Sequence, residues 1–545
     1  MKKEILLGND AIIKGALAAG VDFVSGYPGC PSAEIGDDFS KIAKENGVYV
    51  EWSTNEKTAL EAAVGASFSG LKSLVNMKSF GINVCSDVLF PLAYTGTKAP
   101  MVIVVADDPS CWSSAQSEQD SRGYAYISNV PVLDPADPQE CYEFTKLGFE
   151  ISEKFNIPVI LRTTTRAAHQ RAIVSFEEVG KKERKIGEFV KNHHQFLTMP
   201  PRVLEMKKEL LEKIKKISSF AEKNEVNNIL GNKGSKIGII TSGVSSMYVN
   251  EALKELGLDL PVLKLGIFYP LPEKKISNFL KGKTKVLIAE ELNPYIEKDI
   301  IRIAKTANPK IQIFGKNILP EIGELNPELL CIALAKITGK KYKKFSVKQL
   351  NLPKRTARLC DGCPYWYILP TVKKIAPEGT IFGGDIGCNM IGALAPHSMY
   401  DYMFCMGSSI GIAHGISKAE GPERSRRVIS FMGDGTFFHS GIAGLINTVY
   451  NKSNPLMIVL DNRITAMTGH QTNPGMGKTI TGEDTQELQI ADIAKSCGVK
   501  NVKVLDPINV KELEDTVKEF LEKEETSLIV CKRVCALLAK RQSKI

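Results

Sequence analysis

Residues 427–436, RVISFMGDGT, decide the fold, because an apolar run ends there in an aspartate that stands between two glycines. A helical pattern follows, and a second apolar run at 456–460 ends in the pair Asp461-Asn462. This alternation is typical of a doubly wound sheet of parallel strands. Asp434 and Asn462 are 28 residues apart (434 to 462). We expect both at the carboxyl ends of neighbouring strands, where open α/β sheets bind ligands.

The residue types in this segment suit a diphosphate held with a magnesium ion. Gly433 and Gly435 let the backbone approach a phosphate closely, and the following helix begins with a favourable potential for an anion. Asp434 and Asn462 carry oxygen atoms of the kind that Mg²⁺ accepts. A Gly-Asp-Gly triplet alone is more often a simple turn. With an asparagine at this distance, the segment resembles the thiamine-diphosphate motif, in which the backbone carbonyl two residues beyond the asparagine, here Ile464, completes the metal ligands.

The whole chain predicts a multidomain α/β protein with doubly wound parallel sheets. Short apolar runs alternate with helical patterns in the first region, and the same alternation returns after the middle of the chain. A Lys/Glu-rich stretch with few strand signals separates the two and predicts a helical connector. We place an α/β domain at 1–175, the connector at 176–232, a second α/β domain at 233–345 and a third at 350–545.

The composition is that of a large globular protein and excludes several classes. With 43% hydrophobic and 24% charged residues, the chain can bury the cores of several domains. The charge of +9 arises from 70 basic and 61 acidic residues, a mild excess that does not indicate nucleic-acid binding. No apolar run reaches the roughly 18 residues that span a bilayer, and the first residues lack a signal-peptide pattern. We expect a cytoplasmic protein that binds neither nucleic acid nor membrane.

Four of the twelve cysteines form a candidate metal site. Cys360 and Cys363 form a CxxC pair, Cys388 follows in the string GDIGC, and Cys535 lies near the C-terminus. Reduced thiols clustered in a cytosolic chain are interpreted first as metal ligands. Two close and two distant thiolates are typical of a structural zinc site or of an iron–sulfur cluster. Spacing alone does not choose between them, and zinc is the default.

An activating carboxylate is needed by any thiamine enzyme, so that the aminopyrimidine ring can remove the C2 proton of the thiazolium. Glu56 opens the helical pattern at 56–67, which resembles the pyrimidine-domain helix of thiamine enzymes, and Glu56 is therefore the candidate. The alternative is an acid that merely favours the dipole of the first helical turn. Glu61 is the second choice.

Several longer strings resemble the large subunit of indolepyruvate ferredoxin oxidoreductases, which belong to the thiamine-diphosphate-dependent 2-oxoacid:ferredoxin oxidoreductases. They are EWSTNE at 51–56, VVADDP at 104–109, EQDSR at 118–122, GDGTFFHSG at 433–441 and DNRITAMTGHQ at 461–471. The similarity extends over nearly the whole chain. It implies that 1–175 binds the pyrimidine, that 233–345 is similar to the transketolase C-terminal domain, and that 350–545 binds the diphosphate.

The resemblance also implies an activity and its cofactors. It implies oxidative decarboxylation of aryl 2-oxoacids, such as indolepyruvate, with coenzyme A to arylacetyl-CoA and CO₂, and with ferredoxin as electron acceptor. Thiamine diphosphate, Mg²⁺ and a 4Fe-4S cluster would be bound, the cluster by Cys360, Cys363, Cys388 and Cys535, with Cys531 as an alternative fourth ligand. A smaller beta subunit is the expected partner. The rival hypotheses are a non-redox decarboxylase or carboligase and a non-catalytic assembly or regulatory subunit.

Two departures from the family pattern affect substrate and electron transfer. Cys30, in the loop GYPGCPS, replaces a threonine that in relatives hydrogen-bonds the substrate carboxylate, and a thiol is a poorer donor. The ferredoxin-like extension of the family does not follow Cys535, so we expect electrons to leave through another partner. His439 and His470, near the magnesium motif, are candidates to move a proton or to contact diphosphate or coenzyme A, or else have structural roles.

Overall fold

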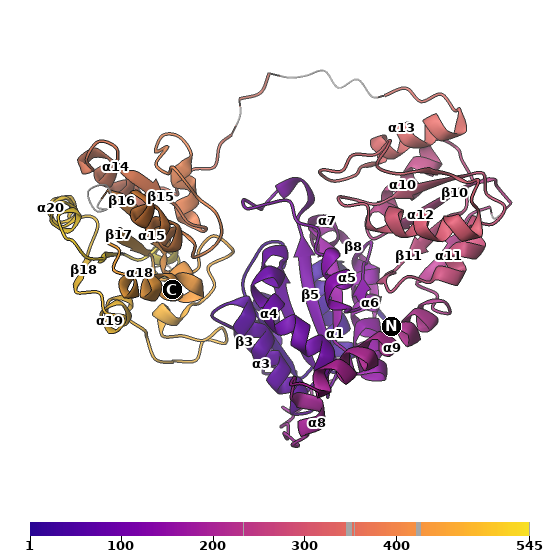
Figure 1. The fold of residues 1–545 in the computed structure, drawn as a ribbon, viewed down its shortest axis with the longest axis horizontal. Helices are drawn as coiled ribbons and strands as arrows, with labels where there is room; N and C mark the ends of the chain where they lie inside the picture. The colour runs from indigo at the N-terminus through magenta and orange to yellow at the C-terminus, as the bar shows by residue number, and fades with distance from the viewer. Residues whose placement is uncertain (233, 345–350, 354, 421–426, 544–545) are drawn as a thin grey trace. The chain divides into compact units, whose positions relative to one another are not determined.

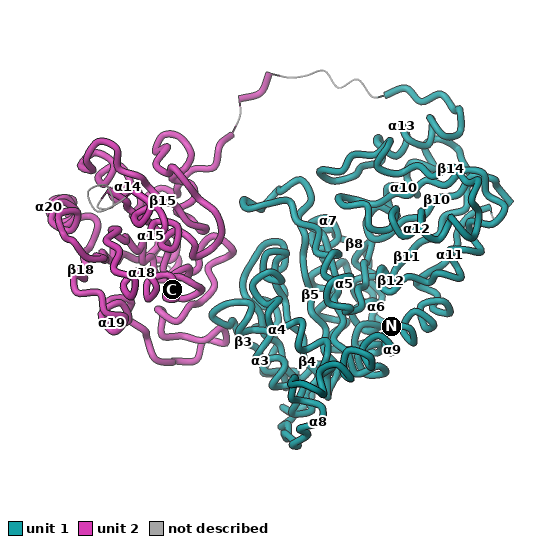
Figure 2. Tube along the Cα trace, in the orientation of Figure 1, with its two compact units in different colours: residues 1–348 teal, residues 349–545 magenta. Residues whose placement is uncertain are grey.

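The computed structural model describes residues 1–232, 234–344, 351–353, 355–420 and 427–543. The chain forms two compact units, residues 1–348 and 349–545, shown in different colours in Figure 2. The boundaries predicted at 233, 345 and 350 lie outside the described residues. Among the residues described, no helix is long and apolar enough to cross a membrane.

The first sheet of the first unit has the strand order β12-β6-β7-β5-β4-β2-β3, and its strands β5 and β3 are labelled in Figure 1. All neighbours are parallel except β12, which pairs antiparallel with β6. Every side chain of the central strand β5 is buried, as expected where helices cover both faces of a sheet. The strands are β2 (Phe23–Gly26), β3 (Tyr49–Trp52), β4 (Ser73–Lys78), β5 (Met101–Asp107), β6 (Val132–Leu133), β7 (Val159–Thr164) and β12 (Ile267–Tyr269).

Helices pack on this sheet, and a small antiparallel pair of strands, β1 (Lys2–Leu7) with β8 (Arg171–Phe176), lies beside it. Helix α4 directly follows β4, and α3 packs against it. The helices are α1 (Gly8–Ala18), α2 (Ala33–Ile42), α3 (Glu56–Phe68), α4 (Ser79–Thr95), η1 (Pro109–Cys111), α5 (Gly123–Ser128), α6 (Pro138–Phe155) and α7 (Thr165–His169).

The second sheet of this unit has the order β14-β13-β10-β11-β9, parallel except for β9. The predicted connector 176–232 contains α8 (His193–Phe196) and α9 (Arg202–Ala221), and its last residues form the edge strand β9. The strands are β9 (Asn227–Leu230), β10 (Ile237–Ser242), β11 (Val262–Leu265), β13 (Lys285–Ala289) and β14 (Gln312–Phe314). The helices are α10 (Ser245–Glu255), α11 (Glu273–Leu280), α12 (Tyr295–Ala307) and α13 (Pro327–Thr338).

The second unit is built on an all-parallel sheet of order β15-β16-β17-β19-β18. The strands are β15 (Ile381–Gly383), β16 (Val428–Gly433), β17 (Leu456–Asp461), β18 (Asn501–Leu505) and β19 (Ser527–Lys532). The helices are α14 (Tyr365–Ile375), η2 (Cys388–Ala393), α15 (Ser409–Glu420), α17 (Asp434–Thr436), η3 (Phe437–Gly441), α18 (Ile442–Tyr450), η4 (Pro474–Met476), α19 (Ile490–Ser496), α20 (Val510–Leu521) and α21 (Ala536–Gln542). The predicted fold class, α/β with parallel sheets, is confirmed.

A buried ionic network joins the two sheets of the first unit. Arg162 of β7 pairs with Asp107 at 2.8 Å and with Asp134 at 3.2 Å. Asp134 also accepts a hydrogen bond of 2.8 Å from the Ser242 hydroxyl at the end of β10. Arg162 is only 2% exposed, so its two carboxylate partners depend on it for neutralisation.

Replacing Arg162 by methionine tests this network, because the change leaves two buried carboxylates without their cation. We expect Arg162→Met to lower the free energy of unfolding of the first unit by about 3–5 kcal/mol. The matched control is Arg302→Met, since Arg302 makes only exposed ion pairs with Glu273 and Asp299, and should cost about 1 kcal/mol or less. Calorimetric unfolding of both variants measures the difference, and equal shifts would contradict the prediction.

Candidate functional site

The Gly-Asp-Gly segment lies where β16 ends. Gly433 pairs with Leu460 of β17, so the two strands end side by side and Asp434 and Asn462 follow on neighbouring strands. Asp434 is 3% exposed and Asn462 7% exposed. The structure therefore brings together the two side chains that the sequence analysis assigned to magnesium, at the carboxyl edge of a parallel sheet.

Asp434 lies in a buried, negatively charged environment. Burial, together with the nearby Asp461 carboxylate, raises the pKa of Asp434 to about 7, although a hydrogen bond from Asn473 opposes the shift. The Asn473 amide donates to Oδ2 of Asp434 at 3.0 Å. Burial also raises the pKa of Asp461, although Arg463 opposes this shift. A divalent cation would offset the repulsion between these carboxylates, so the site fits Mg²⁺.

Asn462 forms hydrogen bonds that connect this edge of the sheet to Tyr365, Ile464 and Cys535. Its amide nitrogen donates to the Tyr365 hydroxyl at 3.0 Å, and its side-chain oxygen accepts from the backbone N–H of Ile464 at 3.2 Å. Its backbone carbonyl accepts from the backbone N–H of Cys535 at 3.0 Å. Tyr365 comes two residues after Cys363 in the chain. Asn462 is thus bonded to two of the three segments that carry the predicted cluster ligands, the one with Cys363 and the one with Cys535.

The glycines of the motif leave the backbone accessible on one side and closely packed on the other. A Cβ added at Gly435 would lie 2.9 Å from Oγ1 of Thr465, whereas at Gly433 the nearest atom would be 3.8 Å away.

A single continuous helix follows, with a π-helical turn at Phe437–Gly441. Such turns are frequent at functional sites. His439 lies in this turn, is buried, and its Nδ1 is 2.9 Å from the Ser440 hydroxyl.

The sequence analysis missed Asp385, which organises the loop before Cys388. Its carboxylate accepts from the backbone N–H groups of Ile386, Gly407 and Ser409 at 2.7, 2.8 and 3.0 Å. Burial outweighs these three hydrogen bonds, which favour the charged form, and the pKa of Asp385 is raised to about 7. Asp385 thereby ties the loop that carries Cys388 to the start of α15. The signal was available, because GDIG is a second acid enclosed by glycines.

The thiols of Cys360, Cys363, Cys388 and Cys535 gather in one region of the second unit. Burial, with contributions from the other three thiols, raises the pKa of Cys388 to about 12. Burial, with Cys360 and Cys535, similarly raises the pKa of Cys363 to about 11. Four thiols that influence one another's pKa are the kind of donors that bind zinc or an iron–sulfur cluster.

In the described structure, these four thiols are not arranged as a complete set of metal ligands. Within the described ranges, no three His, Cys, Asp or Glu side chains stand in an arrangement that could hold a metal ion. Cys531, the alternative fourth ligand, is buried in β19, and burial alone raises its pKa. His470 lies beside the thiols, with its Nε2 3.8 Å from Sγ of Cys535. The structure therefore places His470 next to Cys535.

Glu56 is the first residue of α3 in the first unit, and it is 7% exposed. Asn55 caps this helix by accepting a hydrogen bond from the N–H of Thr58. The Glu56 side chain packs against Gly81 of α4, where an added Cβ would lie 2.6 Å from Cγ of Glu56. Glu61, the second choice, is half exposed and lies 4.0 Å from the Lys57 ammonium. Of the two, only Glu56 is in a position shielded from water.

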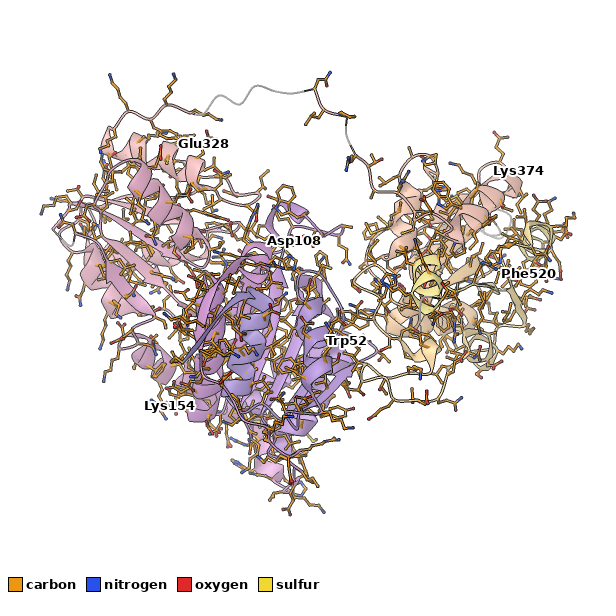
Figure 3. All side chains as sticks on the ribbon, turned by 180° about the vertical axis from the view of Figure 1, so that it is seen from behind. Trp52, Asp108, Lys154, Glu328, Lys374 and Phe520 are labelled. Atoms are coloured by element: carbon orange, nitrogen blue, oxygen red, sulfur yellow. The ribbon has the colours of Figure 1, made fainter. Side chains whose placement is uncertain are left out.

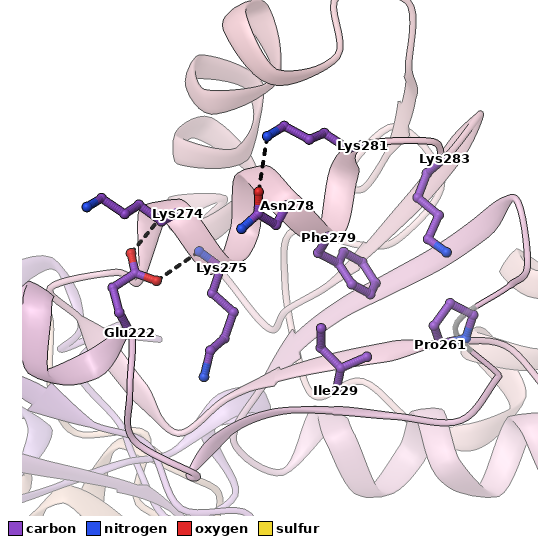
Figure 4. A pocket seen from close by; sticks show the side chains of 9 residues that line it. All are labelled: Glu222, Ile229, Pro261, Lys274, Lys275, Asn278, Phe279, Lys281 and Lys283. Atoms are coloured by element: carbon purple, nitrogen blue, oxygen red, sulfur yellow. Dashed lines mark hydrogen bonds between the residues drawn. The ribbon is translucent and has the colours of Figure 1, made fainter.

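One hollow of about 410 Å³ lies elsewhere, on the second sheet of the first unit (Figure 4). Four of its nine lining residues are lysines, namely Lys274, Lys275, Lys281 and Lys283. None of the predicted site residues lines it. The predicted chemistry therefore does not involve this hollow.

Comparisons with protein families agree with the motifs. The model for the thiamine-diphosphate-binding part of pyruvate flavodoxin/ferredoxin oxidoreductases matches residues 14–218. The model for the C-terminal, thiamine-pyrophosphate-binding domain of thiamine pyrophosphate enzymes matches residues 385–531. Fold and site together define a thiamine-diphosphate-dependent enzyme.

Similar proteins of known name show which family of thiamine-diphosphate-dependent enzymes the chain belongs to. Indolepyruvate oxidoreductase subunit IorA of Methanothermobacter marburgensis is 42% identical over 98% of this chain and 87% of its own length. The subunits of the same name from Pyrococcus horikoshii and Archaeoglobus fulgidus are 41% and 36% identical, over 98% and 99% of this chain and 86% and 88% of their own lengths. The chain belongs to this family of indolepyruvate oxidoreductase subunits, within the thiamine-diphosphate-dependent 2-oxoacid oxidoreductases, so the resemblance seen in the sequence is confirmed.

One solved structure supports the fold. The 2-oxoglutarate:ferredoxin oxidoreductase from Magnetococcus marinus, solved with 2-oxoglutarate, coenzyme A and succinyl-CoA bound, superposes with a TM-score of 0.50. The match covers 61% of this chain and 65% of that chain at 20% sequence identity. At this identity the likeness shows the fold alone.

The role of Asp434 can be tested with a variant of the same shape. Asp434→Asn removes the buried charge that would bind the cation, and we expect the affinity for thiamine diphosphate with Mg²⁺ to fall by at least about 100-fold. Calorimetric titration measures it. Asp484→Asn is the control, because Asp484 is exposed and pairs with Lys478; an equal loss in both variants would exclude the assignment.

Proposed function

We propose that this protein oxidatively decarboxylates aryl 2-oxoacids, indolepyruvate among them, with coenzyme A to arylacetyl-CoA and CO₂, and passes the electrons to ferredoxin. The observation that carries the proposal is the gathering of four thiols beside the strand end that bears Asn462, where the Cys535 N–H bonds the Asn462 carbonyl. An enzyme that transfers electrons needs an acceptor close to its thiamine, whereas a simple decarboxylase does not.

Each predicted residue has a role in this proposal. Asp434, Asn462 and the carbonyl of Ile464 hold Mg²⁺, and Gly433 and Gly435 admit the diphosphate. Thiamine diphosphate supplies, when bound, an electron sink for the carbon that loses CO₂, and a 4Fe-4S cluster supplies an acceptor of single electrons.

Proton movements are assigned to two further side chains. The Glu56 carboxylate would contact the aminopyrimidine of bound thiamine diphosphate and hold a proton there, a role that its shielded position against Gly81 favours. His439, buried in the π-helical turn that follows Asp434, handles a proton or contacts the diphosphate. His470, beside Cys535, adjusts the surroundings of the cluster.

The proposal includes partners and a compartment. Relatives of this chain are named as subunits of an oxidoreductase, and we infer a smaller beta subunit and ferredoxin, or a ferredoxin-like subunit, as the route for electrons. None of the twelve cysteines forms a disulfide, and we infer that the protein works in the cytoplasm, where thiols stay reduced. A non-redox decarboxylase or carboligase, in which the four cysteines hold zinc or no metal, is the second candidate.

Glu56→Gln tests the activating carboxylate. The amide keeps the shape of the side chain but cannot hold the proton, so we expect 2-oxoacid-dependent reduction of viologen to fall by at least about 100-fold. Binding of thiamine diphosphate should stay within a few-fold of that of the parent. Glu61→Gln, five residues along the same helix, is the control and should keep full activity. If Glu56→Gln instead left the activity unchanged, the result would support the hypothesis that this chain is a non-catalytic assembly or regulatory subunit.

Iron and acid-labile sulfide content distinguish the redox enzyme from its rival. Protein purified without oxygen should contain about four iron atoms and four sulfides per chain, and Cys363→Ser should lose most of both. Cys405→Ser is the control, because Cys405 is an exposed thiol outside the group of four. A protein that contains zinc, or no metal, and still decarboxylates 2-oxoacids would establish the non-redox alternative.

A further inference from the structure

Lys78 places a half-buried ammonium at the carboxyl edge of the first sheet. It is the last residue of β4, which lies between β5 and β2, and the next residue begins α4. Ligands bind at this edge of open α/β sheets. The Nζ atom donates a hydrogen bond of 3.0 Å to the carbonyl of Ser113. In the described part of the chain, Lys78 forms no ion pair.

The nearest acid, Asp108, is engaged elsewhere (labelled in Figure 3). Its carboxylate accepts from the Thr165 hydroxyl at 2.6 Å, from the Ser114 hydroxyl at 2.7 Å and from the backbone N–H of Ser113 at 2.7 Å. Burial alone would raise the pKa of Asp108, but these hydrogen bonds outweigh it and hold the pKa below its usual value. Asp108 thus stays charged without forming a contact ion pair with Lys78.

The Ser113 carbonyl and the Phe80 ring, whose centroid is 5.2 Å from Nζ, contact the ammonium, but within the described residues no carboxylate pairs with it, so part of its desolvation cost is not offset. Burial lowers its pKa, while the more distant Asp108, Cys30 and Cys111 oppose that shift. A partly buried charge is costly unless a counter-ion pairs with it. A small anion placed against Nζ would remove this cost.

The surroundings of Lys78 restrict where such an anion would lie. A Cβ added at Gly29 would be 2.7 Å from Cβ of Lys78, so the loop that carries Cys30 packs directly on the lysine stem. On the other side, Gly81, three residues after Lys78, packs against the Glu56 side chain. An anion at Lys78 would thus lie between the Cys30 loop and the start of α4, near the proposed catalytic carboxylate.

We propose that Lys78 binds the carboxylate of the 2-oxoacid substrate, the group that leaves as CO₂. This inference rests on the proposed function. The neighbouring Cys30 thiol is a weak donor, so the ammonium supplies the strong contact. In the reaction the bond between C1 and C2 breaks, the electron pair stays on C2, and the carboxylate departs as neutral CO₂. Lys78 thereby loses its counter-ion at that step, and its contact selects acids over uncharged analogues.

The test measures substrate affinity with and without the charge. In the holoenzyme, Lys78→Met should raise the KM for phenylpyruvate in viologen reduction by about 10- to 100-fold, with kcat changed less than about threefold. The reason is that the variant lacks the ionic contact with the substrate carboxylate. Lys78→Arg keeps the charge and should recover part of the affinity. Lys57→Met is the control, since Lys57 is a lysine of α3 that pairs with Asp87 at the surface, and should leave both constants unchanged.

Direct binding provides a readout without turnover. In Glu56→Gln protein, calorimetry should show phenylpyruvate binding more tightly than phenylpyruvamide, and Lys78→Met in this background should abolish the preference. Thiamine diphosphate titration verifies that each variant is folded. If the parent oxidises phenylpyruvate but Lys78→Met keeps its KM and its preference for the acid, the inference is wrong while the proposed function stands. A parent that neither binds nor oxidises any 2-oxoacid would overturn both.

Discussion

The pairing of β16 with β17 is the constraint on which the chemistry of the second unit depends. Because Gly433 lies opposite Leu460, two strands of a parallel sheet end together, and the polar residues that follow them meet at one edge. Asp434 and Asp461 are both buried there, and the Asp461 carboxylate makes the ionised form of Asp434 less favourable. A cation at this edge would offset that repulsion. The same edge holds Asn462, which is bonded to the segments that carry Cys363 and Cys535.

Much of this edge could be predicted from local sequence. An apolar run that ends in Gly-Asp-Gly, and a second run that ends in Asp-Asn one strand–helix unit later, define strand ends whose neighbours follow from the rules of α/β topology. Glu56 could be placed in the first turn of a helix for the same reason. The resemblance already favoured Glu56 over Glu61; what the sequence could not predict is that the packing of α4 buries Glu56 and leaves Glu61 half exposed.

Contacts between distant segments could not be predicted. The bonds of Asp385 to Gly407 and Ser409 cross from one loop to another, although its glycine-flanked position was a signal. No sequence motif surrounds Lys78. Its role as a candidate anion-binding residue depends on Asp108, whose carboxylate accepts hydrogen bonds from Ser113, Ser114 and Thr165 and does not pair with the lysine. The ion pairs of Arg162 likewise join strands far apart in the chain. Such features arise from packing and not from periodicity.

Strand β12 also has a consequence for how this protein can be rearranged. In chain order it belongs to the region that forms the second sheet, yet it completes the first sheet by pairing with β6. If recombination between relatives exchanged the region of the first sheet without that of the second, or the reverse, β6 would come from one parent and β12 from the other. The two paired strands would then no longer match. The first 348 residues should therefore be inherited, and transplanted by engineers, as a single module, whereas the second unit contains every strand of its own sheet.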